Sequence, residues 1–255
     1  CAASASGQPA TQPATRAATQ PTVGRAEWEL LRKLEVAGDK HRTIRAELTY
    51  EVVNRMLGDK ELRTGWVAYQ KGDDKAPTRF RVTFRTLQLG EGRAARAEVD
   101  YVFDGQWLHV ARHKTKTLTM YQLAAKGQKV EAFKIGKGPF PIPFGQSARD
   151  VVRFFEPTTR APRTGDPEGT VYLRLDPRAE HAEQLPTRRL EMWIDAKTHL
   201  PVRLRSRDKN RNVTTVAFGK ITTNKDVPEG VFELPRRLGW ETIRRPLSRS
   251  GGLAP

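Results

Sequence analysis

The sequence predicts a mainly β fold of about ten antiparallel strands and two helices, on the basis of three observations. Short segments alternate apolar and polar residues with the period of two that a half-buried strand requires. Turn residues separate these segments at short intervals. No apolar run approaches the roughly 20 residues that cross a bilayer as a helix. At 255 residues the chain is long enough for one such domain, because sandwiches and barrels of this size are often undivided.

The N-terminal segment has a different composition from the rest of the chain. Residues 2–24 consist almost entirely of Ala, Thr, Ser, Pro, Gln and Gly, so they bury too little apolar area to fold. We therefore expect a disordered tether at 1–24 and one folded domain at 25–255. Cys1 is the only cysteine, which excludes an internal disulfide and any cysteine-cluster metal site.

The elements of the domain follow in order along the chain. Trp28, Leu31 and Leu34 have helical spacing, which predicts an amphipathic first helix that ends near Gly38. Asp104-Gly105 predicts a type I′ hairpin, because both central residues of that turn need positive φ. Alternating patterns predict strands within 43–53, 62–70, 79–87, 98–103, 106–113, 116–123, 170–175, 188–208, 212–223 and 230–235.

The rhythm of strands is interrupted once. Prolines and glycines at 136–145 lead into a strongly apolar stretch that predicts a second helix with Val151, Val152, Phe154 and Phe155. After it, Leu190, Met192 and Ile194 face one way, and Arg203, Arg205 and Arg207 face the other. One face of the sheet is thus expected to be apolar and the other basic.

The basic face agrees with the whole-chain balance of 45 Lys and Arg against 29 Asp and Glu, a net charge of +16. Such a charge favours anionic partners: lipid head groups, nucleic acid or acidic polysaccharides. We find no nucleic-acid-binding motif, so we expect no nucleic-acid partner. A solvated basic face without a partner is the simpler interpretation of the same rows of arginine.

The start of the chain resembles a mature bacterial lipoprotein. In that family the first cysteine after signal cleavage carries the acyl chains, a small residue such as Ala2 follows it, and a linker of this composition comes next. The resemblance implies that Cys1 is lipidated and anchors the domain at a membrane of the bacterial envelope, with the outer membrane favoured.

The body resembles the LolA/LolB-like family of periplasmic lipoprotein carriers and outer-membrane lipoprotein receptors over roughly residues 26–236. The matching segments are "YVFDGQWLHVARHKTKTLTMYQL" and "MWIDAKTHLPVRLRSRDKNRNVTTVAFGKITTNKDVPEGVFELP". The resemblance implies an unclosed antiparallel β-barrel of about ten to eleven strands, with an N-terminal helix and a helical lid over an apolar cavity for acyl chains.

The same resemblance implies roles for individual residues. The lid would contain Val151, Phe154 and Phe155, and Lys71 would be the latch between lid and barrel. The residues that could line the cavity, or alternatively fill an ordinary core, are Trp66, Phe80, Val82, Phe84, Tyr101, Phe103, Met120, Met192 and Ile194.

Catalytic and metal sites have no support in the sequence. No Gly-rich phosphate loop or nucleophile motif is present, so we expect no enzyme activity and no cofactor. His109 and His113 have an i, i+4 spacing, but on a strand they lie about 13 Å apart, which does not favour a shared metal.

The expected function is that of a membrane-anchored, monomeric protein that accepts acyl chains of a lipid or lipoprotein and transfers them. Two alternatives remain open. The same fold can serve as an envelope sensor or scaffold that binds a protein partner. An electrostatic binder of nucleic acid or acidic polysaccharide would instead lose affinity steeply with salt.

Overall fold

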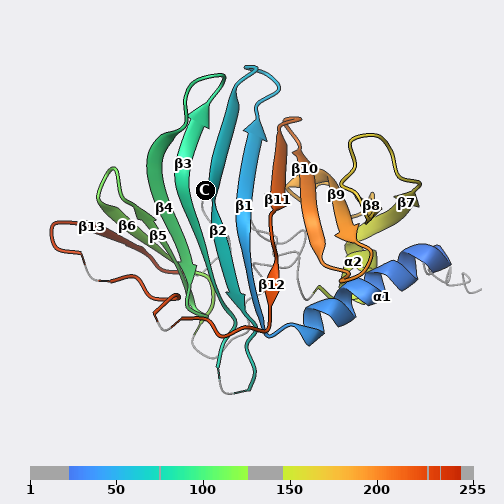
Figure 1. Cartoon of the computed structure of the whole chain (residues 1–255), viewed down its shortest axis with the longest axis horizontal. Coiled ribbons are helices and arrows are strands. Elements are labelled where there is room, and N and C mark those ends of the chain that lie inside the picture. Colours follow the sequence, from blue (N-terminus) through green and yellow to red (C-terminus); the bar gives the residue numbers. More distant parts are fainter. Residues whose placement is uncertain (1–22, 75, 126–145, 229, 236, 248–255) are drawn as a thin grey trace, which may run out of the picture.

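The structure is a computed structural model that describes residues 23–74, 76–125, 146–228, 230–235 and 237–247. Thirteen strands form one sheet in the order β13-β6-β5-β4-β3-β2-β1-β11-β10-β9-β8-β7, and β12 pairs beside β1 (Figure 1). Neighbouring strands are antiparallel except β13, which is parallel to β6. The strands are β1 Thr43–Val53, β2 Lys60–Gln70, β3 Arg79–Leu89, β4 Ala95–Phe103, β5 Trp107–Arg112, β6 Thr117–Gln122, β7 Phe155–Arg160, β8 Thr170–Pro177, β9 Thr187–Asp195, β10 Pro201–Asp208, β11 Val213–Phe218, β12 Thr222–Thr223 and β13 Glu241–Arg245.

Two helices are described, and both pack at the β7–β10 half of the sheet (Figure 1). Helix α1, Arg25–Lys40, buries a stripe of leucines at helical spacing. Its acidic residue Glu27 lies in the first turn and Lys40 in the last, where each complements the helix dipole. Helix α2, Ala148–Phe154, begins at Ser147, whose hydroxyl accepts a hydrogen bond from the Asp150 amide.

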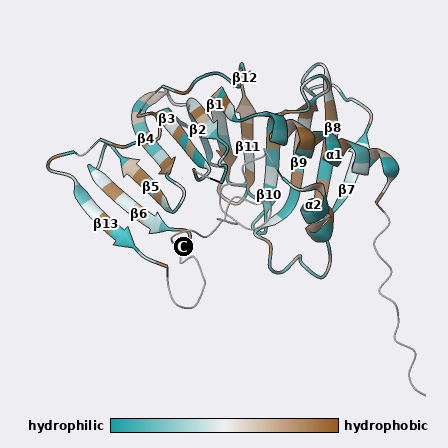
Figure 2. Cartoon of the chain, turned by 90° about the horizontal axis from the view of Figure 1, so that it is seen from below, coloured by the Kyte–Doolittle hydropathy of each residue, from teal (hydrophilic) through white to brown (hydrophobic). Residues whose placement is uncertain are grey.

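The face of the sheet that packs against α1 is here called the inner face, and the opposite one the outer face. Apolar and polar residues alternate along many of the strands (Figure 2). Successive residues of a strand point to opposite faces of the sheet. Two clusters of buried apolar side chains form the core. The first joins α1 and α2 to β8, β9 and β10. The second lies on β1 to β5 and includes Ala37 of α1, so α1 contributes to both clusters.

The edge of the sheet at β7 is covered in part by α1. The carboxylate of Glu27 accepts hydrogen bonds from the Thr159 amide at 3.2 Å and the Thr159 hydroxyl at 2.7 Å. The hydroxyl bond is the main reason that the pKa of Glu27 lies below its usual value. This contact occupies an outward-facing amide of an edge strand, a group that could otherwise pair with another chain.

Several predicted elements differ from the structure. The sheet has thirteen strands instead of ten or eleven. Residues 230–235 form a turn and an irregular segment rather than a strand, and β13 was not predicted. The turn after β4 is not type I′, because only Gly105 has positive φ. Asp104 instead accepts hydrogen bonds from the Gln106 and Trp107 amides, each at 2.8 Å.

No helix among the described residues is long and apolar enough to cross a membrane.

Candidate functional site

Seven of the nine predicted cavity residues share the inner face. Cross-strand pairing sets this, because residues directly opposite each other in an antiparallel pair point to the same side. Phe80 lies opposite Phe103 on β4, and their rings stack at 5.6 Å. Met192 and Ile194 belong to the first core cluster. The seven are Phe80, Val82, Phe84, Tyr101, Phe103, Met192 and Ile194.

Trp66 and Met120 do not lie on this face, which corrects their assignment to the same lining. Trp66 lies opposite Thr83 on the outer face, and the Arg81 guanidinium lies 5.4 Å from its ring. Met120 lies opposite His109, also on the outer face. Both are apolar residues of strands, but the alternation along each strand places them on the polar, outer face.

The inner-face residues are packed to different degrees. Phe103 and Ile194 are 1% and 0% exposed, which identifies them as core. Val82 and Tyr101 are only partly buried against the second cluster. The positions on β3 and β4 that keep some exposure are therefore the better candidates for contact with a ligand.

The predicted lid residues lie at the first core cluster. Val151 in α2 is 4% exposed, Phe154 ends the helix, and Phe155 is the first residue of β7 with 0% exposure. The predicted latch residue, Lys71, directly follows β2. Its ammonium group binds the Asp39 carboxylate of α1 at 2.6 Å, so it links α1 to the end of β2. Cys1 lies outside the described residues.

An exposed apolar patch lies at the tips of two neighbouring hairpins, and the sequence did not indicate it. Met56, Leu57 and Leu89 are 83%, 72% and 63% exposed. The turn between β1 and β2 carries the first two, and Leu89 ends β3; the Gly90 amide binds the Lys60 carbonyl oxygen at 2.7 Å. In Figure 1 these turns lie side by side at one end of the sheet. Exposed apolar groups gathered at one point favour contact with a partner or a membrane.

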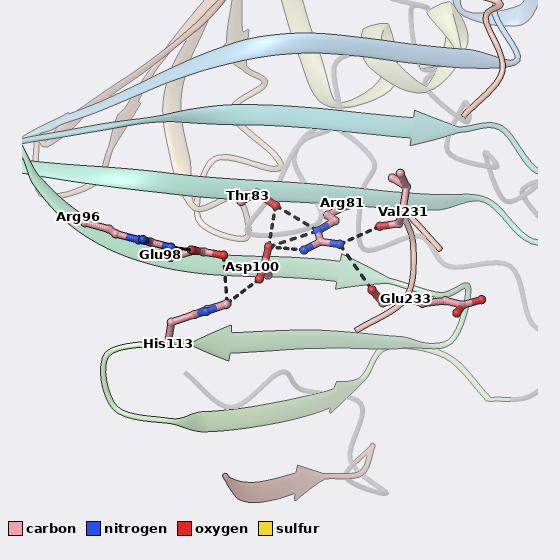
Figure 3. Close-up of polar contacts among 8 residues, drawn as sticks. All are labelled: Arg81, Thr83, Arg96, Glu98, Asp100, His113, Val231 and Glu233. Atoms are coloured by element: carbon pink, nitrogen blue, oxygen red, sulfur yellow. Dashed lines mark hydrogen bonds and ion pairs between the residues drawn. The ribbon is translucent and has the colours of Figure 1, made fainter. Parts of the chain in front are cut away.

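The outer face of β3 to β5 carries a polar cluster around Asp100, which is 0% exposed (Figure 3). Its carboxylate accepts hydrogen bonds from the Thr83 hydroxyl at 2.6 Å and the Arg81 guanidinium at 2.8 Å. The His113 imidazole lies 2.8 Å from its other oxygen. Burial alone would raise the pKa of Asp100, but the hydrogen bonds from Thr83, Arg81 and His113 outweigh it and hold the pKa below its usual value.

This cluster also fixes the C-terminal part of the chain. Arg81 donates to the carbonyl oxygen of Val231 at 3.1 Å, so the segment after β12 is held on the outer face. Further along, the Trp240 ring packs edge-on against His113 at 5.2 Å. The segment then reaches the sheet edge as β13.

His109 and His113 contact different carboxylates. His109 lies 2.9 Å from Asp104, whereas His113 lies beside Asp100 and Glu98. The grouping of His113 with Glu98 and Asp100 was not predicted from the sequence. The register of the β4–β5 hairpin, in which Phe103 lies opposite Leu108, could have indicated that grouping.

Arg203 and Arg205, two of the three predicted outer-face arginines, have carboxylate or aromatic partners. Arg205 binds Glu191 through two hydrogen bonds, at 2.8 and 2.9 Å, and Tyr172 donates a third to the same carboxylate. Arg203 and Arg205 also lie 5.5 and 5.3 Å from the Trp193 ring. Part of the positive charge is thus engaged within the sheet and does not face a partner as free charge.

No family model and no curated protein matches the chain. The chain is similar in fold to several solved structures. An uncharacterized conserved protein from Thermus thermophilus has a TM-score of 0.50 at 14% identity, over 87% of this chain and 100% of that chain. A chain of the Pseudomonas aeruginosa MucA/MucB complex has a TM-score of 0.45 at 17% identity; the match covers 82% of this chain and 61% of that one. LolA superfamily protein NE2245 from Nitrosomonas europaea has a TM-score of 0.37 at 10% identity, covering 82% of this chain and 97% of that chain.

At these identities the similarity extends to the fold alone. Two parts of the architecture expected from the resemblance are observed: a large unclosed sheet of mostly antiparallel strands, and an N-terminal helix. The protein is therefore a mainly β protein built on one large open sheet.

Proposed function

We propose that the protein binds acyl chains of a lipid or lipoprotein against the inner face of its sheet and transfers them at a bacterial envelope membrane. The observation that carries this proposal is the contrast between the two faces of an unclosed sheet. The inner face presents aromatic and aliphatic side chains from β1 to β10, while ion pairs and hydrogen bonds occupy much of the outer face. An open sheet with one apolar face can enclose a chain-like apolar ligand.

In this proposal an acylated Cys1 holds the domain at the periplasmic face of a membrane, with the outer membrane favoured, and residues 2–24 act as the tether. The protein works as a monomer without a cofactor and without making or breaking bonds. Two acyl chains on one residue anchor stably where one is marginal.

Transfer requires a change of affinity, which we assign to α2. Val151 and Phe155 attach this helix to the first core cluster, while Phe154 is only partly buried. Movement of α2 would expose apolar surface of β7 and β8 to a ligand. A ligand that binds the open form more tightly than the closed form shifts the equilibrium between them.

Replacing Val82 by aspartate is expected to reduce bound lipid about tenfold or more. An acyl chain would remove water from the carboxylate and offers no hydrogen bond in return, which lowers the affinity for lipid. Val82 is suited to this test because it lies on the inner face and is only partly buried. The full chain carrying Cys1→Ser would be produced in a bacterial periplasm, purified without detergent and analysed by native mass spectrometry. The expected result is one acylated ligand per protein.

Leu238→Asp is the matched control, because Leu238 is fully exposed and the charge change is the same. It should keep its lipid, and thermal unfolding should show that both variants are folded. A parent protein that is reproducibly empty and takes up no added lipid would contradict the proposal and favour a partner-binding scaffold.

Replacing both Met56 and Leu57 by serine is expected to weaken binding to lipid vesicles about tenfold, since both side chains are free to enter a membrane surface. Basic residues Arg55 and Arg93, which are exposed near the patch, would add attraction to anionic head groups. Sedimentation with phosphatidylglycerol-containing vesicles measures the partition, again on the Cys1→Ser chain. Unchanged partitioning would show that the hairpin tips do not contact the membrane.

A further inference from the structure

Three side chains on the outer face place possible metal ligands close together, and the proposed lipid binding does not use them. The carboxylates of Glu98 and Asp100 and the imidazole of His113 offer one ligand atom each, all within 4.8 Å of one another (Figure 3). Glu98 and Asp100 are two positions apart on β4, so both point to the same face. His113 follows β5, and its amide binds the Glu98 carbonyl oxygen at 3.2 Å, which sets it directly across the hairpin.

The distances within this group suit a small ion. Nε2 of His113 lies 2.8 Å from Asp100 and 3.6 Å from Glu98. Glu98 is therefore too far from the imidazole for a hydrogen bond, although its carboxylate faces it. Ligands at about 2.0–2.2 Å from a tetrahedral zinc ion lie about 3.3–3.6 Å apart, so small shifts of side chains would place all three around one ion.

The surrounding residues already orient two of the ligands. Thr83 and Arg81 both bind the same oxygen of Asp100, which leaves its second oxygen facing His113. Trp240 packs edge-on against the imidazole. Hydrogen bonds to the atoms of a ligand side chain that do not contact the metal fix the orientation of that side chain and raise metal affinity.

The group is also open to solvent on one side. Glu98 borders an outer-face pocket of about 590 Å³, together with Trp66, Arg81 and Arg96. An ion could enter by this pocket, and water could occupy its fourth coordination position. Three protein ligands with one open position are a common arrangement for zinc outside purely structural sites.

Nearby positive charge lowers the affinity of the site for a cation but does not prevent binding. Arg81 binds Asp100 through the oxygen that the ion does not need. Arg96 binds Glu98 at 3.2 Å, but its side chain is 87% exposed and can move into water.

We propose that Glu98, Asp100 and His113 form a binding site for a divalent transition-metal ion, with zinc preferred. One imidazole nitrogen and two carboxylate oxygens favour zinc over calcium or magnesium, which prefer oxygen ligands alone. The site would fasten β4 to the end of β5, next to the point where Trp240 contacts the sheet.

The test is a zinc titration of the full chain in competition with a chromophoric chelator. The chain carries Cys1→Ser so that no thiol contributes. The expected result is one zinc ion per chain, with affinity lowered about 100-fold or more by His113→Gln and by Glu98→Gln. Cobalt in place of zinc should give the visible absorption of a tetrahedral site, which both variants should lose.

His109→Gln is the matched control, because His109 is also a histidine of this hairpin but pairs with Asp104 instead of Asp100. It should leave zinc affinity unchanged within about threefold. Glu98→Gln keeps the test decisive if His113→Gln fails to fold, because the Glu98 carboxylate is partly exposed. Absence of a one-to-one site, or equal loss of affinity in His109→Gln, would overturn the proposal.

Discussion

Asp100→Ala is expected to lower the free energy of unfolding by about 3–5 kcal/mol. Asp100 is fully buried, and its removal leaves Arg81, whose side chain is 17% exposed, without its carboxylate. The Thr83 hydroxyl and His113 lose the same partner. Urea unfolding followed by circular dichroism measures the change.

Glu183→Ala is the control for this prediction, since Glu183 also pairs with a cation but its side chain is 97% exposed. Its effect should stay within about 0.5 kcal/mol. A loss below about 1 kcal/mol for Asp100→Ala would contradict the assigned role of the buried cluster.

The same substitution should change how stability depends on pH. Because the pKa of Asp100 in the folded protein lies below its value in the unfolded chain, its contribution is complete above about pH 4 and is lost as pH falls through the folded pKa. The difference in stability between parent and Asp100→Ala should therefore shrink below about pH 4. A constant difference down to pH 2 would show that ionisation of Asp100 is not what stabilises the fold.

Gly65→Ala is expected to destabilise the protein by about 3 kcal/mol or more, because the chain packs against backbone at this position. A Cβ on Gly65 would lie 1.8 Å from the Thr83 carbonyl oxygen and 2.9 Å from the Phe84 Cα. Backbone of β3 cannot rotate away as a side chain would, and the pairing of β2 with β3 shifts register here.

Thermal and urea unfolding would test the prediction on Gly65. Gly92→Ala is a useful comparison, because its new Cβ would meet a single atom, the Leu89 carbonyl oxygen, at 3.0 Å in an exposed turn. A Gly65→Ala protein as stable as Gly92→Ala would show that β2 and β3 can separate locally without cost.

The sequence predicts most strands because each has one buried and one solvated face, so hydrophobicity alternates visibly. Thr43–Val53 is the clearest case. The prediction of a strand at 230–235 was wrong. Phe232 is apolar, as a strand residue would be, but it lies in an irregular segment, where the Arg79 guanidinium is 5.1 Å from its ring. Strand β13, Glu241–Arg245, has one residue that is not exposed and therefore shows little alternation.

The candidate sites were predictable to different extents. Parity along β3 and β4 places Phe80, Val82 and Tyr101 together, so the inner face could be inferred from sequence. The cluster at Asp100 could not be found by spacing along the chain, because His113 comes 13 positions later and approaches only through hairpin pairing. Exposure of Met56 depends on where the turn projects, which no local pattern indicates.

The position of β1 in the middle of the sheet has a consequence for how the chain folds. One edge of β1 pairs with β2, the next strand in sequence. The other edge pairs with β11, where Leu48 lies opposite Phe218, a residue about 170 positions later. During synthesis from the N-terminus that second edge has no native partner until late. Pairings between such distant segments slow folding, and an open strand edge is a site of aggregation while it lasts. We therefore expect slow refolding whose yield falls as protein concentration rises.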